Sequence, residues 1–315
     1  MPEIRYNGRA FGIHAGETVL EALERQGEAV AHSCRAGLCQ SCLMRCSTGM
    51  PPAEAQKGLK DNQKAQGYFL SCVARPEQDL EIGLPGDALR VEAAIAELAR
   101  LSETVMRVRL TTAAALPYRA GQYVTFLRPG LSRSYSIASL PEERALEFHV
   151  RRIEGGQMSG WLHGQAAVGD TLTIQGPLGD CFYTQRDAAQ PLLLAGAGTG
   201  LAPLYGIVRD ALRQGHTGPI LLYHGARNAQ GLYLVDELRS LAASHPQVAY
   251  HPTLTPLDEA ILGGKRDWKP WRGYFCGDPA LVNVLKKKLF LAGMPMREIF
   301  ADAFLPAAAK PAALL

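Results

Sequence analysis

The stretch CRAGLCQSC, residues 34–42, decides how the first part of this chain folds. Its three cysteines, Cys34, Cys39 and Cys42, follow the spacing C-x4-C-x2-C, and Cys72 stands well downstream. A tight loop of this kind can wrap three thiolates around a small inorganic core, while a residue from elsewhere closes the cage. The spacing therefore predicts a two-iron two-sulfur (2Fe–2S) cluster with these four cysteines as its metal ligands. Such a cluster moves one electron at a time, which indicates a redox relay.

Other uses of these thiols fit less well. A structural zinc site usually presents two paired C-x2-C half-sites, and a disulfide framework suits small secreted domains. Gly37, inside the loop, favours the cluster because the backbone must pass close to sulfide there. Cys46 is a fifth thiol nearby, and we interpret it as a buried bystander.

The composition is that of an ordinary globular protein, with 47% hydrophobic and 20% charged residues. A net charge of +3 is too small to indicate nucleic acid or an anionic membrane as a partner. No segment offers the ~20 uninterrupted apolar residues of a membrane span. The opening MPEIRYNG lacks an apolar signal region and the seven cysteines are odd in number, which together predict a cytoplasmic protein.

At 315 residues the chain is too long for one core, and we expect three domains, at 1–92, 93–188 and 189–315. The first combines a hairpin turn at Asn7-Gly8, a short helix over 17–26, the cysteine loop and a closing strand over 80–84. This order predicts a β-grasp ferredoxin domain.

The second domain shows short strands with glycine and proline punctuation, which is typical of an antiparallel Greek-key β-barrel. These strands are expected over 103–110, 122–127, 133–138, 146–153 and 171–175. The third domain changes character. A continuous apolar strand over 191–195, a glycine turn, a helix over 203–214 and a buried strand over 220–223 predict a doubly wound α/β fold.

The strand Arg133-Ser134-Tyr135-Ser136 in the barrel is a weak signal alone, because any edge strand could carry it. Ahead of a nucleotide-binding α/β domain, however, R-x-Y-S resembles the motif of the ferredoxin–NADP reductase superfamily. The resemblance implies FAD as the cofactor. It implies that Arg133 contacts the flavin pyrophosphate, that Tyr135 packs on the isoalloxazine ring, and that Ser136 bonds near flavin N5.

A second flavin segment follows in the barrel. The strand residues His149, Val150 and Arg151 precede a glycine turn that opens a short helix, and the first amides of a helix suit a pyrophosphate. By the same resemblance we assign Gly156, Met158 and Ser159 to the flavin diphosphate. The turn at 176–179, Gly-Pro-Leu-Gly, also matches the family pattern.

The turn at residues 196–200 carries glycines at alternate positions and precedes a helix. Any strand-to-helix turn can use glycine structurally, yet backbone amides at a helix start also suit a phosphate. Reductases of this superfamily hold the pyridine nucleotide with such a G-x-G-x-G-x-x-P pattern, which implies Gly196, Gly198, Thr199 and Gly200 as its ligands.

The resemblance places Cys276, followed by Gly277 and Asp278, beside the nicotinamide, although a buried, inert thiol is the alternative. It also implies an aromatic near the flavin at Phe304, unless this tail only packs on the surface. Arg227 could grip a 2′-phosphate. The residues at 228–230 are neutral, and the pattern resembles reductases that use NADH, so NADH is expected.

Nearly the whole chain resembles the single-chain reductase components of bacterial multicomponent oxygenases, with an N-terminal plant-type ferredoxin. One departure is Gln40, where plant-type ferredoxins commonly carry a small residue. The resemblance implies that electrons pass from NADH through FAD and the cluster to a terminal oxygenase or other acceptor protein. Ser136 and Cys276 would position the reacting atoms. A reductase of a deoxysugar dehydratase system and an electron-transfer module without a dedicated oxygenase stay open as alternatives.

Overall fold

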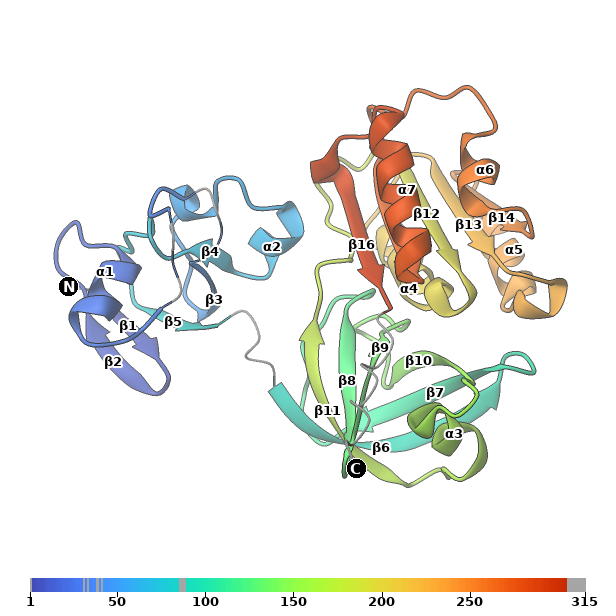
Figure 1. Ribbon diagram of the computed structural model, residues 1–315, viewed down its shortest axis with the longest axis horizontal. Helices are drawn as coiled ribbons and strands as arrows, with labels where there is room; N and C mark the ends of the chain where they lie inside the picture. The colour runs from blue at the N-terminus through green and yellow to red at the C-terminus, as the bar shows by residue number, and fades with distance from the viewer. Residues whose placement is uncertain are drawn as a thin grey trace, which may run out of the picture. The chain divides into compact units, whose positions relative to one another are not determined.

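The computed structural model describes residues 2–30, 32, 34–37, 40, 42–84 and 89–304. The chain divides into two compact units, Met1–Asp87 and Ala88–Leu315, each with its own secondary structure (Figure 1). Within the described part of the chain, no helix combines the length and apolar character needed to cross a membrane.

The first unit is a five-stranded sheet with the order β2-β1-β5-β3-β4, covered by helix α1. Its hairpin turns at Asn7 (φ 51°) and Gly8 (φ 74°), the left-handed pair that a tight two-residue turn requires. Thr18 and Glu21 close a reciprocal capping box at the start of α1. The elements are β1 (Glu3–Tyr6), β2 (Arg9–Gly12), α1 (Val19–Arg25), β3 (Leu43–Thr48), α2 (Asp61–Ala65), β4 (Tyr68–Leu70) and β5 (Leu80–Gly83).

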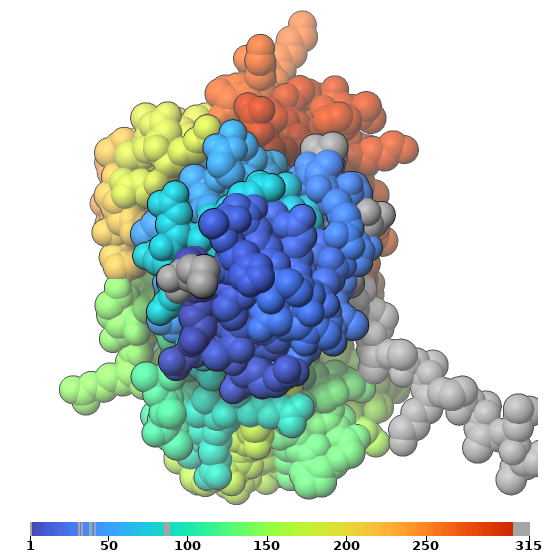
Figure 2. All heavy atoms as spheres, turned by 90° about the vertical axis from the view of Figure 1, so that its left-hand side faces the viewer, coloured from blue at the N-terminus to red at the C-terminus, as the bar shows by residue number. Residues whose placement is uncertain are grey.

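Strand β1 is the first element of this unit and β5 is the last, yet the two strands lie side by side and pair in parallel. In the space-filling view the two segments, dark blue and cyan, belong to one contiguous body (Figure 2). The core is built from apolar residues of α1 and all five strands, among them Ile4, Phe11, Leu20, Met44 and Phe69. The β-grasp prediction is confirmed.

The first part of the second unit is a six-stranded antiparallel sheet with the order β10-β7-β6-β11-β8-β9. An isolated bridge from Ile137 to Phe148 joins the end of β9 to β10, so the sheet closes on itself as a barrel. The elements are β6 (Leu89–Arg100), β7 (Val105–Thr112), β8 (Tyr123–Arg128), β9 (Leu131–Ser136), β10 (Leu146–Arg151), α3 (Gln157–Gly164) and β11 (Thr171–Leu178). The long strand β6 had no counterpart among the expected strands, and it crosses residue 92.

The second part is a parallel sheet with the order β14-β13-β12-β15-β16. Apolar residues of α4 and α5 pack on one face, and those of α6 and α7 pack on the other. The fold is therefore doubly wound, as predicted. The elements are β12 (Leu192–Ala197), α4 (Leu201–Arg213), β13 (Ile220–Gly225), α5 (Val235–Ser244), β14 (Val248–Thr253), α6 (Leu257–Leu262), β15 (Arg272–Gly277), α7 (Pro279–Leu291) and β16 (Ile299–Ala303). The strand order reverses between β12 and β15, and in such sheets ligands bind at the carboxyl ends of the strands beside this switch point.

Candidate functional site

Two of the four expected cluster ligands lie side by side in the first unit. Cys42 and Cys72 are buried, with their Sγ atoms 3.2 Å apart. Burial and the neighbouring Cys42 thiol raise the pKa of Cys72 to about 11. Cys34 is exposed, and its sulfur accepts a hydrogen bond from the Ala36 amide at 3.4 Å. Cys39 lies outside the described residues.

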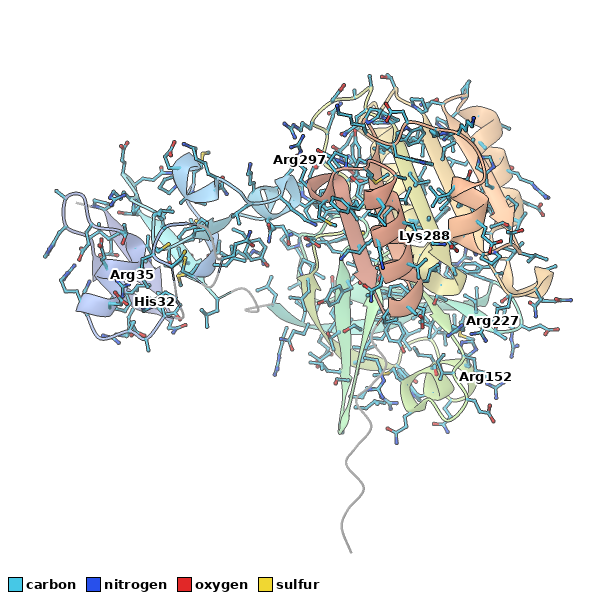
Figure 3. The ribbon with its side chains drawn as sticks, turned by 45° about the horizontal axis from the view of Figure 1, so that its top comes forward. His32, Arg35, Arg152, Arg227, Lys288 and Arg297 are labelled. Carbon is cyan, nitrogen blue, oxygen red and sulfur yellow. The ribbon has the colours of Figure 1, made fainter. Side chains whose placement is uncertain are left out.

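Among the described residues alone, no three ligand-type side chains gather closely enough to hold a metal. The chemistry of the loop nevertheless suits a cluster. Three of its residues, Arg35, Gly37 and Gln40, have positive φ angles of 52°, 72° and 60°. Such turns point successive amides toward one side, where they favour an anionic centre. The loop is also tied to α1, because Arg35 donates to Glu24 at 2.6 Å (Figure 3).

Strand β9 presents the residues of the expected flavin motif. Arg133 donates to the carbonyl of Ser132, and no carboxylate among the described residues pairs with it, so its charge can meet a phosphate. Tyr135 packs on Phe126 with ring centroids 4.7 Å apart. Ser134 is turned to solvent and bonds to Thr125 of the neighbouring strand at 3.1 Å.

Ser136 has a partner that the sequence did not reveal. Its Oγ donates to Oδ2 of Asp302 at 2.6 Å, across 166 positions of sequence. Burial and the nearby Asp180 carboxylate raise the pKa of Asp302 to about 6, although the bond from Ser136 acts in the opposite direction. Strand β16 pairs with β15 so that Asp302 stands opposite Cys276, and this register brings the carboxylate to the barrel.

Cys276 is the last residue but one of β15, lies at the switch point and is fully buried. Its sulfur lies 3.6 Å from that of Cys181, and burial raises the pKa of the Cys276 thiol. The Asp278 side chain caps α7 by accepting from the Ala280 amide. The Phe304 amide donates to the carbonyl of Gly277 at 2.8 Å, which holds the Phe304 backbone beside this turn. The roles of these residues toward nicotinamide and flavin stay predictions.

The glycine turn after β12 lies at the same switch point. A Cβ on Gly200 would lie 2.2 Å from the carbonyl oxygen of Cys276, and one on Gly196 would lie 2.9 Å from it. Gly198 differs: its φ is +54°, and the nearest atom to a Cβ there is Nη1 of Arg151, 4.0 Å away. Two of the glycines thus permit close packing, while Gly198 and the half-buried Thr199 form the side open to a ligand.

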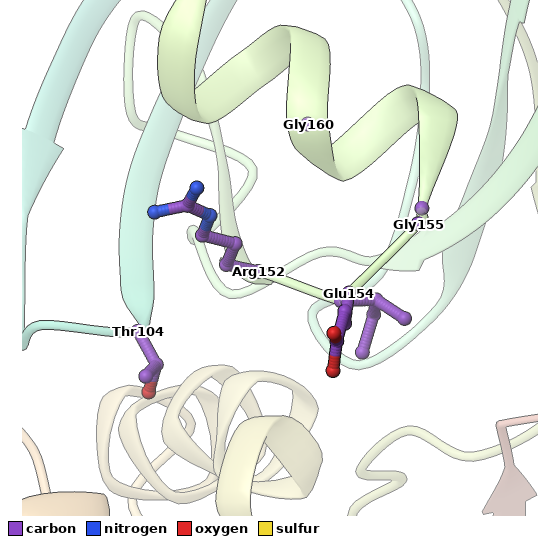
Figure 4. Close-up of a pocket in the computed structure, with 7 residues that line it drawn as sticks. Thr104, Arg152, Glu154, Gly155 and Gly160 are labelled. Carbon is purple, nitrogen blue, oxygen red and sulfur yellow. The ribbon is translucent and has the colours of Figure 1, made fainter.

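The second flavin segment forms a pocket of about 510 Å³ at the start of α3, lined in part by Thr104, Arg152 and Gly156 (Figure 4). The Met158 side chain is buried in the barrel core. The Ser159 Oγ accepts from the Ile153 amide at 3.1 Å. These side chains are committed to the fold, so the expected contact with a diphosphate would fall to the backbone amides of the first helical turn.

The three residues that end β10 point in different directions. Val150 is buried in the barrel core, while Arg151 is exposed and reaches the glycine turn. His149 is buried and turned toward the α/β part, where it meets Tyr233. Arg227 follows β13 and is exposed, on the same side of the second unit as Arg152 (Figure 3).

Three family models match successive parts of the chain. A 2Fe-2S iron-sulfur cluster binding domain matches residues 4–77, an oxidoreductase FAD-binding domain matches 92–183, and an oxidoreductase NAD-binding domain matches 194–269. Together with the β-grasp unit, the barrel and the doubly wound sheet, they define an iron–sulfur flavoprotein oxidoreductase whose cofactors are a 2Fe–2S cluster, FAD and NADH.

Whole-chain relatives narrow this class. The chain is 35% identical to an aromatic O-demethylase reductase subunit of Amycolatopsis sp., over 96% of this chain and 98% of the relative. It is 32% identical, with the same coverage, to the ferredoxin–NAD(P)(+) reductase component of the naphthalene 1,2-dioxygenase system of Pseudomonas putida. The crystal structure of an Amycolatopsis cytochrome P450 reductase matches with a TM-score of 0.67 and 33% identity, covering 98% of this chain and 100% of that one. The chain belongs to the family of electron-transfer reductase components of bacterial oxygenase systems, as the sequence motifs indicated.

Proposed function

We propose that this reductase passes the electrons of NADH to a terminal oxygenase, with hydride transfer at the switch point of its parallel sheet. One observation carries the proposal. The Gly198 turn, Cys276 and the Ser136–Asp302 pair converge where β12 and β15 end, so residues from four segments meet at one place. A bound flavin accepts a hydride and releases single electrons, which is the exchange that a one-electron cluster needs.

The chain's own residues divide this work. Arg133 and the first amides of α3 would hold the flavin diphosphate, because both offer positive charge or donors without a carboxylate partner. Gly198 and Thr199 would hold the nucleotide diphosphate. The Ser136 hydroxyl donates a hydrogen bond to Asp302, which leaves the lone pairs of the Ser136 oxygen free to face the flavin edge.

NADH is the proposed nucleotide rather than NADPH. Arg227 is one exposed cation at the ribose edge, and the Asn228 side chain is engaged within its own loop, accepting from the Gly231 amide at 3.0 Å. A 2′-phosphate would therefore meet a single guanidinium here. We expect kcat/KM to be at least about tenfold higher with NADH than with NADPH. A ratio near one would contradict this assignment.

The carrier sequence is tested by comparing Cys72→Ser with Cys46→Ser. Both thiols are buried in the core of the first unit, but only Cys72 lies beside a second expected ligand. Cys72→Ser should lose the cluster absorption and delivery to a co-purified oxygenase, while NADH still bleaches the flavin band. Cys46→Ser should keep all three. Undiminished delivery by Cys72→Ser would show that electrons do not pass through the cluster.

A further inference from the structure

A buried chain of hydrogen bonds links the barrel to the segment that follows β13. Arg109 of β7 donates to Glu147 of β10 at 2.8 Å. The other oxygen of Glu147 meets Nε2 of His149 at 3.0 Å, and Nδ1 of His149 meets the hydroxyl of Tyr233 at 3.0 Å. Glu147, His149 and Tyr233 are each at most 4% exposed, so water does not satisfy them.

The protonation states of Glu147 and His149 in this hydrogen-bond network follow from the groups they contact. Hydrogen bonds from His149 and Arg109 hold the pKa of Glu147 below its usual range even though burial opposes ionisation. Burial lowers the pKa of His149 despite the neighbouring carboxylate. A carboxylate can only accept, so Nε2 of the neutral imidazole carries the proton and Nδ1 is bare. Tyr233 must therefore donate, and every bond in the chain has one direction.

Two histidine rings also contact the ring of Tyr233, in addition to the hydrogen bond made by its hydroxyl. His149 of the barrel and His224 of β13 contact its ring edge-on, at centroid distances of 5.3 and 5.4 Å. The next residue, Leu234, has a φ of 54°, a conformation that persists only where the surroundings impose it. Because Arg227 stands six residues earlier in the same connection, the place of Tyr233 limits where the ribose edge can lie relative to the barrel.

We propose that Tyr233, held through His149 and Glu147, is a positioning residue that sets the nucleotide's ribose-binding segment against the flavin-binding barrel. This inference rests on the proposed site for NADH at the Gly198 turn. It assigns no chemistry to the three residues. They act through the segment that ends at Tyr233, and displacing this segment would weaken its contacts with the bound nucleotide, which raises KM.

The chain supplies a matched control for a test. Tyr183 and His216 form a second buried pair, with the hydroxyl 3.1 Å from Nδ1 and the rings edge-on at 5.6 Å. Both residues are at most 2% exposed. Neither belongs to the connection that carries Arg227. Tyr233→Phe and Tyr183→Phe therefore remove the same group from similar surroundings.

Both variants would be made in the full-length holoprotein and reduced anaerobically by NADH. We expect kcat/KM for NADH to fall about tenfold in Tyr233→Phe, mainly through KM, and to change less than about twofold in Tyr183→Phe. Light-driven reduction of the flavin, which needs no nucleotide, should be unchanged in both. An equal loss in the two variants, or none in Tyr233→Phe, would overturn the inference.

The wild-type protein separates this outcome from failure of the proposed function, because a wild-type flavin that NADH does not reduce would remove the function itself. Should Tyr233→Phe not fold, Glu147→Gln replaces it. That change leaves both rings in place and removes the carboxylate that fixes the histidine tautomer. It should lower kcat/KM for NADH at least about threefold with unchanged FAD content. An unchanged value would equally overturn the inference.

Discussion

Asp302 is the residue that most changes the picture drawn from sequence. The motif around Ser136 was readable because its four residues are contiguous. Its carboxylate partner was not, since it lies 166 positions away and reaches Ser136 only through the register of β16 on β15. The acidic residue two positions before Phe304 was the one available signal, and no local pattern ties it to the barrel.

The raised pKa of Asp302 predicts a pH dependence with a definite sign. The ordinary value is 3.8 and the folded value is about 6, so the protonated carboxyl is favoured by folding. The stabilisation is complete below pH 3.8 and is lost as the pH rises through 6. Asp302→Asn should therefore be more stable than wild type above pH 6, by about 1–2 kcal/mol in chemical denaturation.

The same residue predicts a kinetic effect. Above pH 6 the ionised Asp302 accepts a hydrogen bond from the Ser136 hydroxyl, and below pH 6 the carboxyl carries a proton of its own. The rate of flavin reduction by NADH should change with an apparent pKa near 6 in wild type. We expect this step to vanish in Asp302→Asn and to remain in Asp278→Asn, whose side chain caps α7 and makes no bond to Ser136. Pre-steady-state rates between pH 5 and 8 give the comparison, and a step retained by Asp302→Asn would rule out this assignment.

At the scale of elements, the glycine turn between β12 and α4 combines two functions that substitution can separate. Gly200→Ala brings a Cβ to 2.2 Å from a backbone oxygen and should cost about 3 kcal/mol of unfolding free energy. Gly198→Ala meets no atom nearer than 4.0 Å and should cost about 1 kcal/mol for its left-handed φ.

The effect on nucleotide binding should be larger in Gly198→Ala, the variant that loses less stability. A methyl group on Gly198 would occupy the open side of the turn, so we expect KM for NADH to rise about fivefold to tenfold while the fold is kept. Urea denaturation and steady-state kinetics on both proteins test this. An unchanged KM in Gly198→Ala would place the nucleotide diphosphate elsewhere.

Sequence patterns predicted most elements because hydrophobic periodicity and turn residues coincide in them, as at Asn7-Gly8 and in the apolar run of β12. Strand β6 is the exception. Its sequence, LRVEAAIAELAR, is rich in residues that favour helices, and only Val91, Ala93 and Ile95 alternate inward. Pairing with β7 and β11 overrides this local preference. The same limit applies to His149, whose direction is set by which face of β10 the α/β part covers.

At the scale of the whole molecule, the two units have separate hydrophobic cores. The first core draws only on residues 4–82, and the clusters of the second unit begin at Val91. Each unit therefore buries its own apolar surface and should fold alone. Expressed separately, residues 89–315 should bind FAD and oxidise NADH with artificial acceptors. They should not support the oxygenase, and two unfolded fragments would contradict this prediction.

This separation has a consequence for how such reductases diversify. The unit that oxidises the nucleotide and the ferredoxin unit that delivers electrons are separate parts of the chain, which divides after Asp87. Evolution can therefore exchange the ferredoxin unit without changing the residues that bind the nucleotide. A chimera in which a relative's ferredoxin unit replaces residues 1–84 should keep this protein's coenzyme preference. It should deliver electrons to the oxygenase that the relative serves.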